Sequence, residues 1–218
     1  MSITKATQFL RAVSRLFLLA CAIALAAAGE ARAQDKKAGQ KESGPSMVAD
    51  FEGERVENAD GLALAPLADE QYGGNSETGL SLIHPGTQGS RGAVRISFRI
   101  AAGSPYPFAS VFVMLGPEGL PTDLSAYRGL RFYARSREKS FLTGLSQHAG
   151  RTTRYLARFE AKPEWSLVEV PFANLKPDPQ AEKPPAFAPK GVMSVEFGMG
   201  SGQPGQVDLD IDQVEFYK

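Results

Sequence analysis

Apolar residues take alternate positions over much of this chain, most clearly between Asp123 and Lys218. Leu130-Arg131-Phe132-Tyr133-Ala134 is one example, and Val207–Asp212 is another. A side-chain period of two places one face of a strand in the core and the other face in water. No stretch of this region has the length and period of a long amphipathic helix. The pattern therefore predicts an all-β fold of short strands separated by Gly and Pro.

The segments expected to be strands are Met47–Phe51, Leu62–Leu67, Leu80–Ile83, Ala93–Ile100, Phe108–Leu115, Gly129–Ala134, Phe141–Leu145, Thr153–Phe159, Ser166–Pro171, Val192–Phe197 and Val207–Tyr217. Short strands with turn residues between them indicate two packed antiparallel sheets, a β-sandwich. Phe108–Leu115 is nearly all apolar, which predicts burial on both faces and a central place in its sheet.

Three features outside the strands carry structural expectations. Asp123–Tyr127 is expected to form one helical turn, with the Asp123 carboxylate accepting a backbone N–H at its start. Lys176–Lys190 contains five prolines, so it is expected to be a surface loop, ordered in part by Phe187. Trp165, the only tryptophan, is expected to pack against the core rather than to serve as a ligand platform.

Residues 1–33 have the pattern of a cleaved signal peptide. Basic residues precede the apolar run Leu16–Ala28, and Ala31-Arg32-Ala33 fits the small-x-small cleavage rule. An uncleaved anchor is the alternative, but the run is shorter than the about 20 residues that a membrane span needs. The polar residues 34–46 cannot bury enough surface to order themselves, so they predict a flexible tether before a folded domain at 47–218.

Leu18-Leu19-Ala20-Cys21 offers a second processing signal, because it resembles a bacterial lipoprotein box. Leu19 fits that box poorly and the apolar run continues past Cys21, which favours cleavage after Ala33. Either signal predicts an exported protein, periplasmic or extracellular, and membrane association is expected only if Cys21 is lipidated.

The composition of the chain argues against two classes of function, those that depend on cysteine and those that bind nucleic acid. Cleavage after Ala33 removes Cys21, the only cysteine, so the mature chain can hold no disulfide, cysteine metal site or thiol nucleophile. Four of the 24 basic residues and one of the 24 acidic residues lie in the leader, which leaves 20 and 23. This slightly acidic balance lacks the basic footprint of a nucleic-acid-binding protein.

Catalytic motifs are missing from the sequence. The two histidines, His84 and His148, lie in expected turns and are predicted to be solvated. No Gly-x-Ser-x-Gly, His-Glu-x-x-His or phosphate-loop motif occurs. A hydrolase of the glycosidase type needs two opposed carboxylates, whereas Asp208, Asp210 and Asp212 lie along one strand. The chain is therefore predicted not to be an enzyme.

These three aspartates should share one face of the last strand. Their charges repel one another unless they are solvated, paired or bound to a cation. Calcium prefers carboxylate and carbonyl oxygens, and Glu52 and Asp212 are the candidate metal ligands. A wet acidic strand face is the alternative. Structural calcium is thus an expectation, and no cofactor is expected to be required.

The candidate ligand-binding surface combines aromatic and polar side chains. Sugar rings stack their C–H faces on aromatic rings and bond their hydroxyls to polar neighbours. Arg131 and Tyr133 should project from one face of their strand, with Arg154, Tyr155 and His148 nearby. A plain solvated face is the alternative.

Several segments occur in the order in which a known family has them. They are Asp50-Phe51-Glu52, Asp69-Glu70-Gln71-Tyr72-Gly73-Gly74-Asn75-Ser76, Phe108-Ala109-Ser110-Val111, Asp123–Leu130, Tyr155-x-Ala157-x-Phe159, Trp165 with Val168–Phe172, and Leu209–Val214. In these segments the chain resembles the NADH:ubiquinone oxidoreductase complex I intermediate-associated protein 30 family. The resemblance implies a galactose-binding-like jelly roll, similar to family 11 carbohydrate-binding modules. Mitochondrial members are non-catalytic assembly factors for respiratory complex I, whereas the leader here looks bacterial-secretory.

Two functions follow from these observations. The first is a non-catalytic exported binding module that recognises a protein partner or a glycan through one face of the sandwich. The second is an assembly factor or chaperone for an envelope or respiratory complex, which would capture its partner through strand edges or through the Pro-rich loop 176–190.

Overall fold

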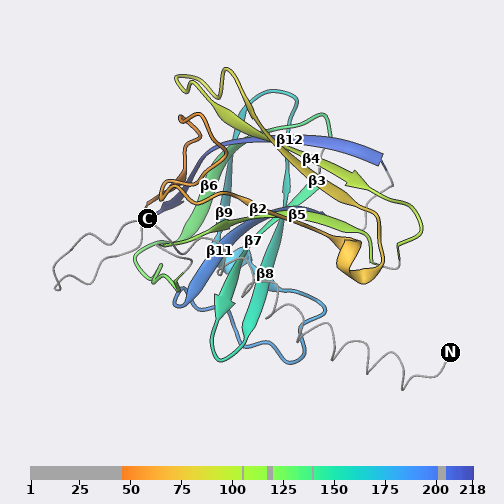
Figure 1. Ribbon diagram of the computed structural model, residues 1–218. Helices are drawn as coiled ribbons and strands as arrows, with labels where there is room; N and C mark the ends of the chain where they lie inside the picture. The colour runs from red at the N-terminus through yellow and green to blue at the C-terminus, as the bar shows by residue number, and fades with distance from the viewer. Residues whose placement is uncertain (1–45, 105, 117–119, 139, 201–204) are drawn as a thin grey trace, which may run out of the picture. The chain divides into compact units, whose positions relative to one another are not determined.

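The computed structural model describes residues 46–104, 106–116, 120–138, 140–200 and 205–218 (Figure 1). The predicted signal peptide, Cys21 and nearly all of the predicted tether lie outside these residues. The described chain forms two antiparallel sheets connected by turns, loops and short 3-10 helices. No helix among these residues is long and apolar enough to cross a membrane.

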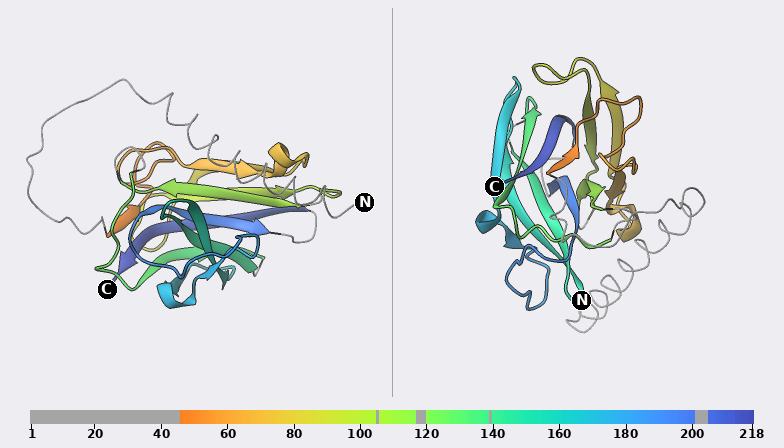
Figure 2. Two further views of the ribbon diagram at one scale, coloured as in Figure 1. Left: turned by 90° about the horizontal axis from the view of Figure 1, so that it is seen from below. Right: turned by 90° about the vertical axis from the view of Figure 1, so that its left-hand side faces the viewer.

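The first sheet has the strand order β3-β4-β12-β6-β9, and β1 also pairs with β12. Its strands are β1 Met47–Ala49, β3 Glu77–Ile83, β4 Ala93–Ile100, β6 Gly129–Arg135, β9 Ser166–Pro171 and β12 Gly205–Tyr217. All the pairs are antiparallel. The strand that comes last in the sequence, dark blue in Figure 2, therefore lies between two strands that come much earlier.

The second sheet has the order β10-β8-β7-β11-β5-β2 and is also antiparallel. Its strands are β2 Ala65–Ala68, β5 Phe108–Met114, β7 Ser140–His148, β8 Thr152–Glu160, β10 Lys176–Pro177 and β11 Val192–Gly200. In Figure 1 the strands β5, β7, β8 and β11 lie below β3, β4 and β12. The two sheets make the predicted sandwich.

The core fills the space between the sheets, because each strand turns alternate side chains inward. Aromatic rings from the two sheets meet there. Phe132 of β6 contacts Phe197 of β11 and Phe159 of β8 edge to face, with ring centroids 5.0 and 5.1 Å apart. Such pairs contribute about 0.5–1.5 kcal/mol each beyond the burial of their area. The alternating pattern thus predicted the core faces correctly.

Most predicted strand positions are confirmed. Ala93–Ile100 and Ser166–Pro171 have the observed bounds, and the other bounds differ by at most three residues at either end. The pattern missed the two-residue strand β10. Proline at its second position has no N–H for a β-ladder, so the segment does not read as a strand in the sequence. The pattern was also wrong about β5, which lies between β11 and the edge strand β2 rather than at the centre of the sheet.

Asp123–Tyr127 forms a hydrogen-bonded turn rather than the predicted helical turn. The Tyr127 N–H donates to Leu124 O at 2.9 Å, and the Ser125 N–H donates to Asp123 Oδ1 at 2.9 Å. The carboxylate therefore has the predicted role of accepting a backbone N–H, but the chain enters β6 before a helix can continue.

The Pro-rich loop is ordered by Phe187, as predicted. The Phe187 ring packs against Tyr155 and Phe172 with centroids 5.2 and 5.4 Å apart. Trp165 differs from its prediction, because it is half-buried and packs under the Arg135 guanidinium, 4.6 Å from the ring centroid. It precedes β9 on the side of the sheet that faces away from the core.

One buried carboxylate holds the turn between β2 and β3. Asp69 accepts the Ser76 N–H at 2.8 Å and the Ser76 hydroxyl at 3.0 Å, and both residues are fully buried. A Cβ at position 74 would lie 2.2 Å from Asp69 Cγ, so Gly74 is required there. Burial raises the pKa of Asp69, but hydrogen bonds from Ser76, Ser104 and the Phe108 N–H together outweigh it and leave that pKa below its ordinary value.

Candidate functional site

The residues predicted to form one ligand surface lie on two different sheets. Arg131 and Tyr133 point outward from β6 in the first sheet, and Arg154 points outward from β8 in the second. The outer faces of two sheets packed face to face lie on opposite sides of the sandwich. His148, at the exposed end of β7, belongs to the second sheet with Arg154, so it too is separated from Arg131 and Tyr133. The predicted cluster therefore does not form.

Tyr155 belongs to the core. It is fully buried, and its hydroxyl donates to Pro185 O at 3.0 Å. Residues alternate along β8, so Tyr155 faces inward where Arg154 faces outward. The expectation that Tyr155 lies on the ligand surface is wrong for this reason. Arg131 is also engaged, because its Nε lies 2.7 Å from Glu215 Oε1.

Arg154 is the centre of a charged network on the outer face of the second sheet. Its Nη2 and Nε donate to the Glu196 carboxylate at 2.5 and 2.9 Å, and its Nη1 donates to Asp178 at 3.0 Å. The Ser110 hydroxyl donates to Glu196 at 2.8 Å. Glu196 is only 1% exposed, although it points away from the core. Burying a carboxylate costs several kcal/mol unless partners of this kind compensate it.

Small polar residues lie beside this network. Strand pairing places Ser194 of β11 next to Ser146 of β7, and Ser146 next to Arg154 of β8. Ser146 is 4% exposed, and its hydroxyl has no hydrogen-bond partner in the described part of the chain. A buried hydroxyl without a partner costs about 1–3 kcal/mol, which a ligand group could recover. We name this surface the polar strip; it consists of Ser110, Ser146, Arg154, Ser194 and Glu196.

Aromatic and apolar side chains border the polar strip. Tyr72 packs against Phe108 with ring centroids 5.8 Å apart. Burial raises the pKa of Tyr72, and the nearby positive charge of Arg154 opposes this effect. Phe112 and Met114 continue the border along β5, and both are half-buried. Hydrogen-bonding groups between apolar side chains are typical of sites for small polyhydroxyl ligands.

The three aspartates of β12 share the outer face of the first sheet, as predicted, and their environments differ. Asp208 is exposed and accepts a hydrogen bond from a serine hydroxyl. Asp210 is buried and is held by Arg95 and Arg135. Asp212 is fully buried. The sequence offered a solvated acidic strand face as the alternative to a cation site. Of the three aspartates, only Asp208 fits that alternative.

The predicted calcium ligands Glu52 and Asp212 are brought together around Ser90. Ser90 Oγ lies 2.6 Å from Glu52 Oε1 and 2.7 Å from Gly92 O, but it has only one hydrogen to donate. Burial raises the pKa of Asp212, the Thr87 N–H at 2.9 Å lowers it, and the charge of Glu52 raises it further. Glu52 also accepts the Arg91 N–H at 3.1 Å and pairs with Arg91 Nε at 3.3 Å, and Asp212 also accepts the Gln213 N–H at 2.7 Å. Both carboxylates therefore already have donors, and a hard cation such as calcium would compete with Arg91 for Glu52.

Side chains alone would not complete such a site. Among the described residues, no group of three or more His, Cys, Asp or Glu side chains is arranged to hold a metal ion. Backbone oxygens such as Gly92 O would have to contribute. Both histidines are exposed, as predicted; the nearest polar contact of His84 is with Arg91 O, and that of His148 is with Thr152 Oγ1.

The chain is similar to one protein family and to several solved structures. The family model of Complex I intermediate-associated protein 30 (CIA30) matches residues 50–211. The family 11 carbohydrate-binding module of the cellulosomal cellulase Lic26A-Cel5E of Clostridium thermocellum is 13% identical, with a TM-score of 0.61, over 81% of this chain and 96% of that one. No curated protein sequence matches the chain.

Two further solved structures have the same fold. The family 11 module from Clostridium thermocellum in complex with a β-1,3-1,4-mixed-linked tetrasaccharide is 14% identical, with a TM-score of 0.59, over 81% of this chain and 97% of that one. A family 30 carbohydrate-binding module is 16% identical, with a TM-score of 0.51, over 71% and 94%. The family match confirms the predicted family resemblance, and the solved structures confirm the predicted two-sheet sandwich fold.

Proposed function

The chain belongs to the Complex I intermediate-associated protein 30 family, and from this premise we propose that it is a non-catalytic binding module whose ligand site is the polar strip. The buried Ser146 hydroxyl carries this proposal, because a folded protein gains nothing from an unpartnered hydroxyl beside a compensated ion pair. A ligand could complete the hydrogen bonds of this hydroxyl once the side chains that cover its oxygen move aside.

A neutral glycan is the ligand class that suits the polar strip. Its hydroxyls can accept from Arg154, whose side chain is 25% exposed, and its ring faces can pack on Tyr72. Arg154 is already compensated by Glu196 and Asp178, so the strip has no positive charge left for an acidic sugar. The tetrasaccharide complex of the similar family 11 module supports a carbohydrate ligand. A glycan array with the mature protein would identify it.

Replacing Ser146 with Ala should weaken glycan binding about tenfold, or about 1.4 kcal/mol, and should stabilise the unliganded protein by about 1 kcal/mol. The stabilisation is expected because the substitution removes a buried group that has no partner. Calorimetric titration and urea unfolding measure the two effects. Ser110→Ala, also in the polar strip, is the comparison for stability alone, and it should destabilise the protein by about 1.5–3 kcal/mol, since Ser110 donates to a charged group. Unchanged affinity in Ser146→Ala would contradict the proposed site.

The family description favours a second candidate, an assembly factor that binds a protein partner. The Pro-rich loop 176–190 is the surface for this role, because extended proline segments bind partners at a low entropic cost. Co-purification from envelope extracts, with and without the loop, separates the candidates. Capture that requires the loop and survives Ser146→Ala would favour the assembly role.

We also propose that calcium binds at Glu52 and Asp212 as a structural ion, with no part in ligand chemistry. Calcium that binds only the folded chain should raise its stability by about 2.7 kcal/mol when its concentration is about 100 times the Kd. Thermal unfolding with calcium and with a chelator measures the shift in Tm. Glu52→Gln should abolish the shift, and a Tm that calcium leaves unchanged would refute the site.

Export is part of the proposed function. The signal-peptide pattern supports a periplasmic or extracellular protein with cleavage after Ala33. Mass spectrometry of the mature N-terminus decides the processing. A chain that begins at Gln34 supports a soluble exported module, whereas a lipid on Cys21 would show that the protein is anchored to a membrane.

A further inference from the structure

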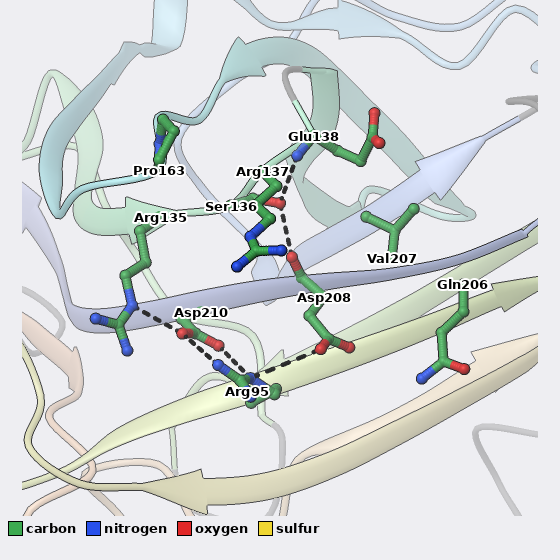
Figure 3. Close-up of a pocket in the computed structure, with 10 residues that line it drawn as sticks. All are labelled: Arg95, Arg135, Ser136, Arg137, Glu138, Pro163, Gln206, Val207, Asp208 and Asp210. Atoms are coloured by element: carbon green, nitrogen blue, oxygen red, sulfur yellow. Dashed lines mark hydrogen bonds and ion pairs between the residues drawn. The ribbon is translucent and has the colours of Figure 1, made fainter.

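The outer face of the first sheet contains a polar hollow of about 580 Å³, on the side of the sandwich opposite the polar strip. Figure 3 shows its lining, which comes from β4, from β12, from the end of β6 with the turn that follows, and from Pro163 in the loop before β9. The hollow is rich in charged groups, but they are not equivalent. Which of them remain available to a ligand decides what the hollow can bind.

Asp210 organises the floor of the hollow. Its Oδ1 accepts Arg95 Nε at 2.7 Å, and its Oδ2 accepts Arg95 Nη2 at 3.0 Å and Arg135 Nε at 2.8 Å. Arg135 also lies over the Trp165 ring at 4.6 Å. The Arg135 guanidinium is therefore fixed on two sides, while its Nη groups make no hydrogen bond within the described residues. A guanidinium fixed in this way loses little side-chain entropy when it binds an anion.

Arg137 adds a charge that is not compensated. In Figure 3 its side chain extends toward the space between Arg135 and Asp208, and it has no ion pair within the described chain. The Glu138 carboxylate points away from this space. The lining thus has three arginines and three acidic residues, but only Asp208 and Asp210 face the arginines. The Arg137 guanidinium is left without an acidic partner inside the hollow. An anionic group would balance it.

We propose that this hollow is a second ligand site, and that it binds an acidic saccharide through the carboxylate of a uronic acid residue. Arginine guanidinium groups recognise a carboxylate by two parallel hydrogen bonds, here from Arg135 and Arg137. Asp208, which is exposed, can accept from a sugar hydroxyl, and the amide of Gln206 can donate or accept. An acidic protein segment fits less well, because its next carboxylate would face Asp208. This site is separate from the polar strip and does not depend on it.

The test is calorimetric titration of the mature protein with trigalacturonate at low salt, in a chelator that removes calcium bridging. The neutral comparison is the methyl ester of the same trisaccharide. Wild type should bind the acid at least about tenfold more tightly than the ester, and Arg137→Gln should lose about tenfold in affinity for the acid. Arg55→Gln removes an exposed arginine elsewhere and is the matched control, expected to bind as wild type does. Thermal unfolding confirms that both variants are folded.

Added salt should weaken the binding, since the site is partly exposed. Equal binding of acid and ester, or an Arg137→Gln variant that binds as wild type does, would overturn the proposal. A hexa-aspartate peptide that binds more tightly than trigalacturonate would also overturn it in favour of an acidic protein partner. None of these results bears on the Ser146→Ala experiment.

Discussion

Replacing Arg154 with Met should lower the free energy of unfolding by about 3–5 kcal/mol, the largest effect expected of any substitution considered for this protein. The methionine would leave Glu196 buried at 1% exposure without its cation. Only the Ser110 hydroxyl would still donate to that carboxylate. Urea unfolding at neutral pH measures the loss.

Arg131→Met is the matched control. Arg131 pairs with Glu215 at 2.7 Å, but the two side chains are 39% and 27% exposed, so the expected loss is at most about 1 kcal/mol. Adding Glu196→Gln to Arg154→Met should restore a large part of the lost stability, because it removes the buried charge. Similar losses in the Arg154 and Arg131 variants would mean that Glu196 is not buried in solution.

Replacing Asp69 with Ala should cost about 2–4 kcal/mol, because two buried donors lose their acceptor. These donors are the N–H and the hydroxyl of Ser76, which is fully buried. Asp60→Ala, at an exposed aspartate in an earlier turn, is the control and should change stability by less than about 0.5 kcal/mol. Denaturant unfolding of the two variants makes the comparison.

The Asp69 effect should depend on pH in a defined direction. Its pKa in the folded chain is lowered, so its contribution is present above the unfolded pKa of about 3.9 and is lost as the pH falls through the folded value. The difference between wild type and Asp69→Ala should therefore shrink from pH 7 to pH 3. A difference that stays constant would mean that the Asp69 charge contributes nothing.

The sequence carried most of the information on strands and little on how strands combine into sheets. Alternation identified both faces of β4 and β6, since burial of one face is a local property. Whether β6 and β8 share a sheet depends on pairing between distant segments, which a period of two does not encode. The error over the ligand surface followed directly, because Arg131 and Arg154 are both outward-facing but on opposite sides.

The polar strip could not be predicted for a similar reason, because its residues come from strands that are distant in the sequence. Glu196 was a signal in the sequence, since a carboxylate within the apolar strand Val192–Phe197 needs a partner. Its partner, Arg154, comes from a different strand, and so does the neighbouring Ser146. By contrast, Glu52 and Asp212, which the sequence offered as candidate calcium ligands, do lie close together around Ser90, and calcium binding stays a prediction.

The central place of β12 has a consequence for biosynthesis. Until residues 205–217 have been made, β4 and β6 lack the strand that joins them, and the first sheet cannot close. A nascent chain that stops short of Gly205 therefore exposes two unpaired edges and cannot reach its final state while it is being translated. The first sheet therefore closes only after β12 has been made.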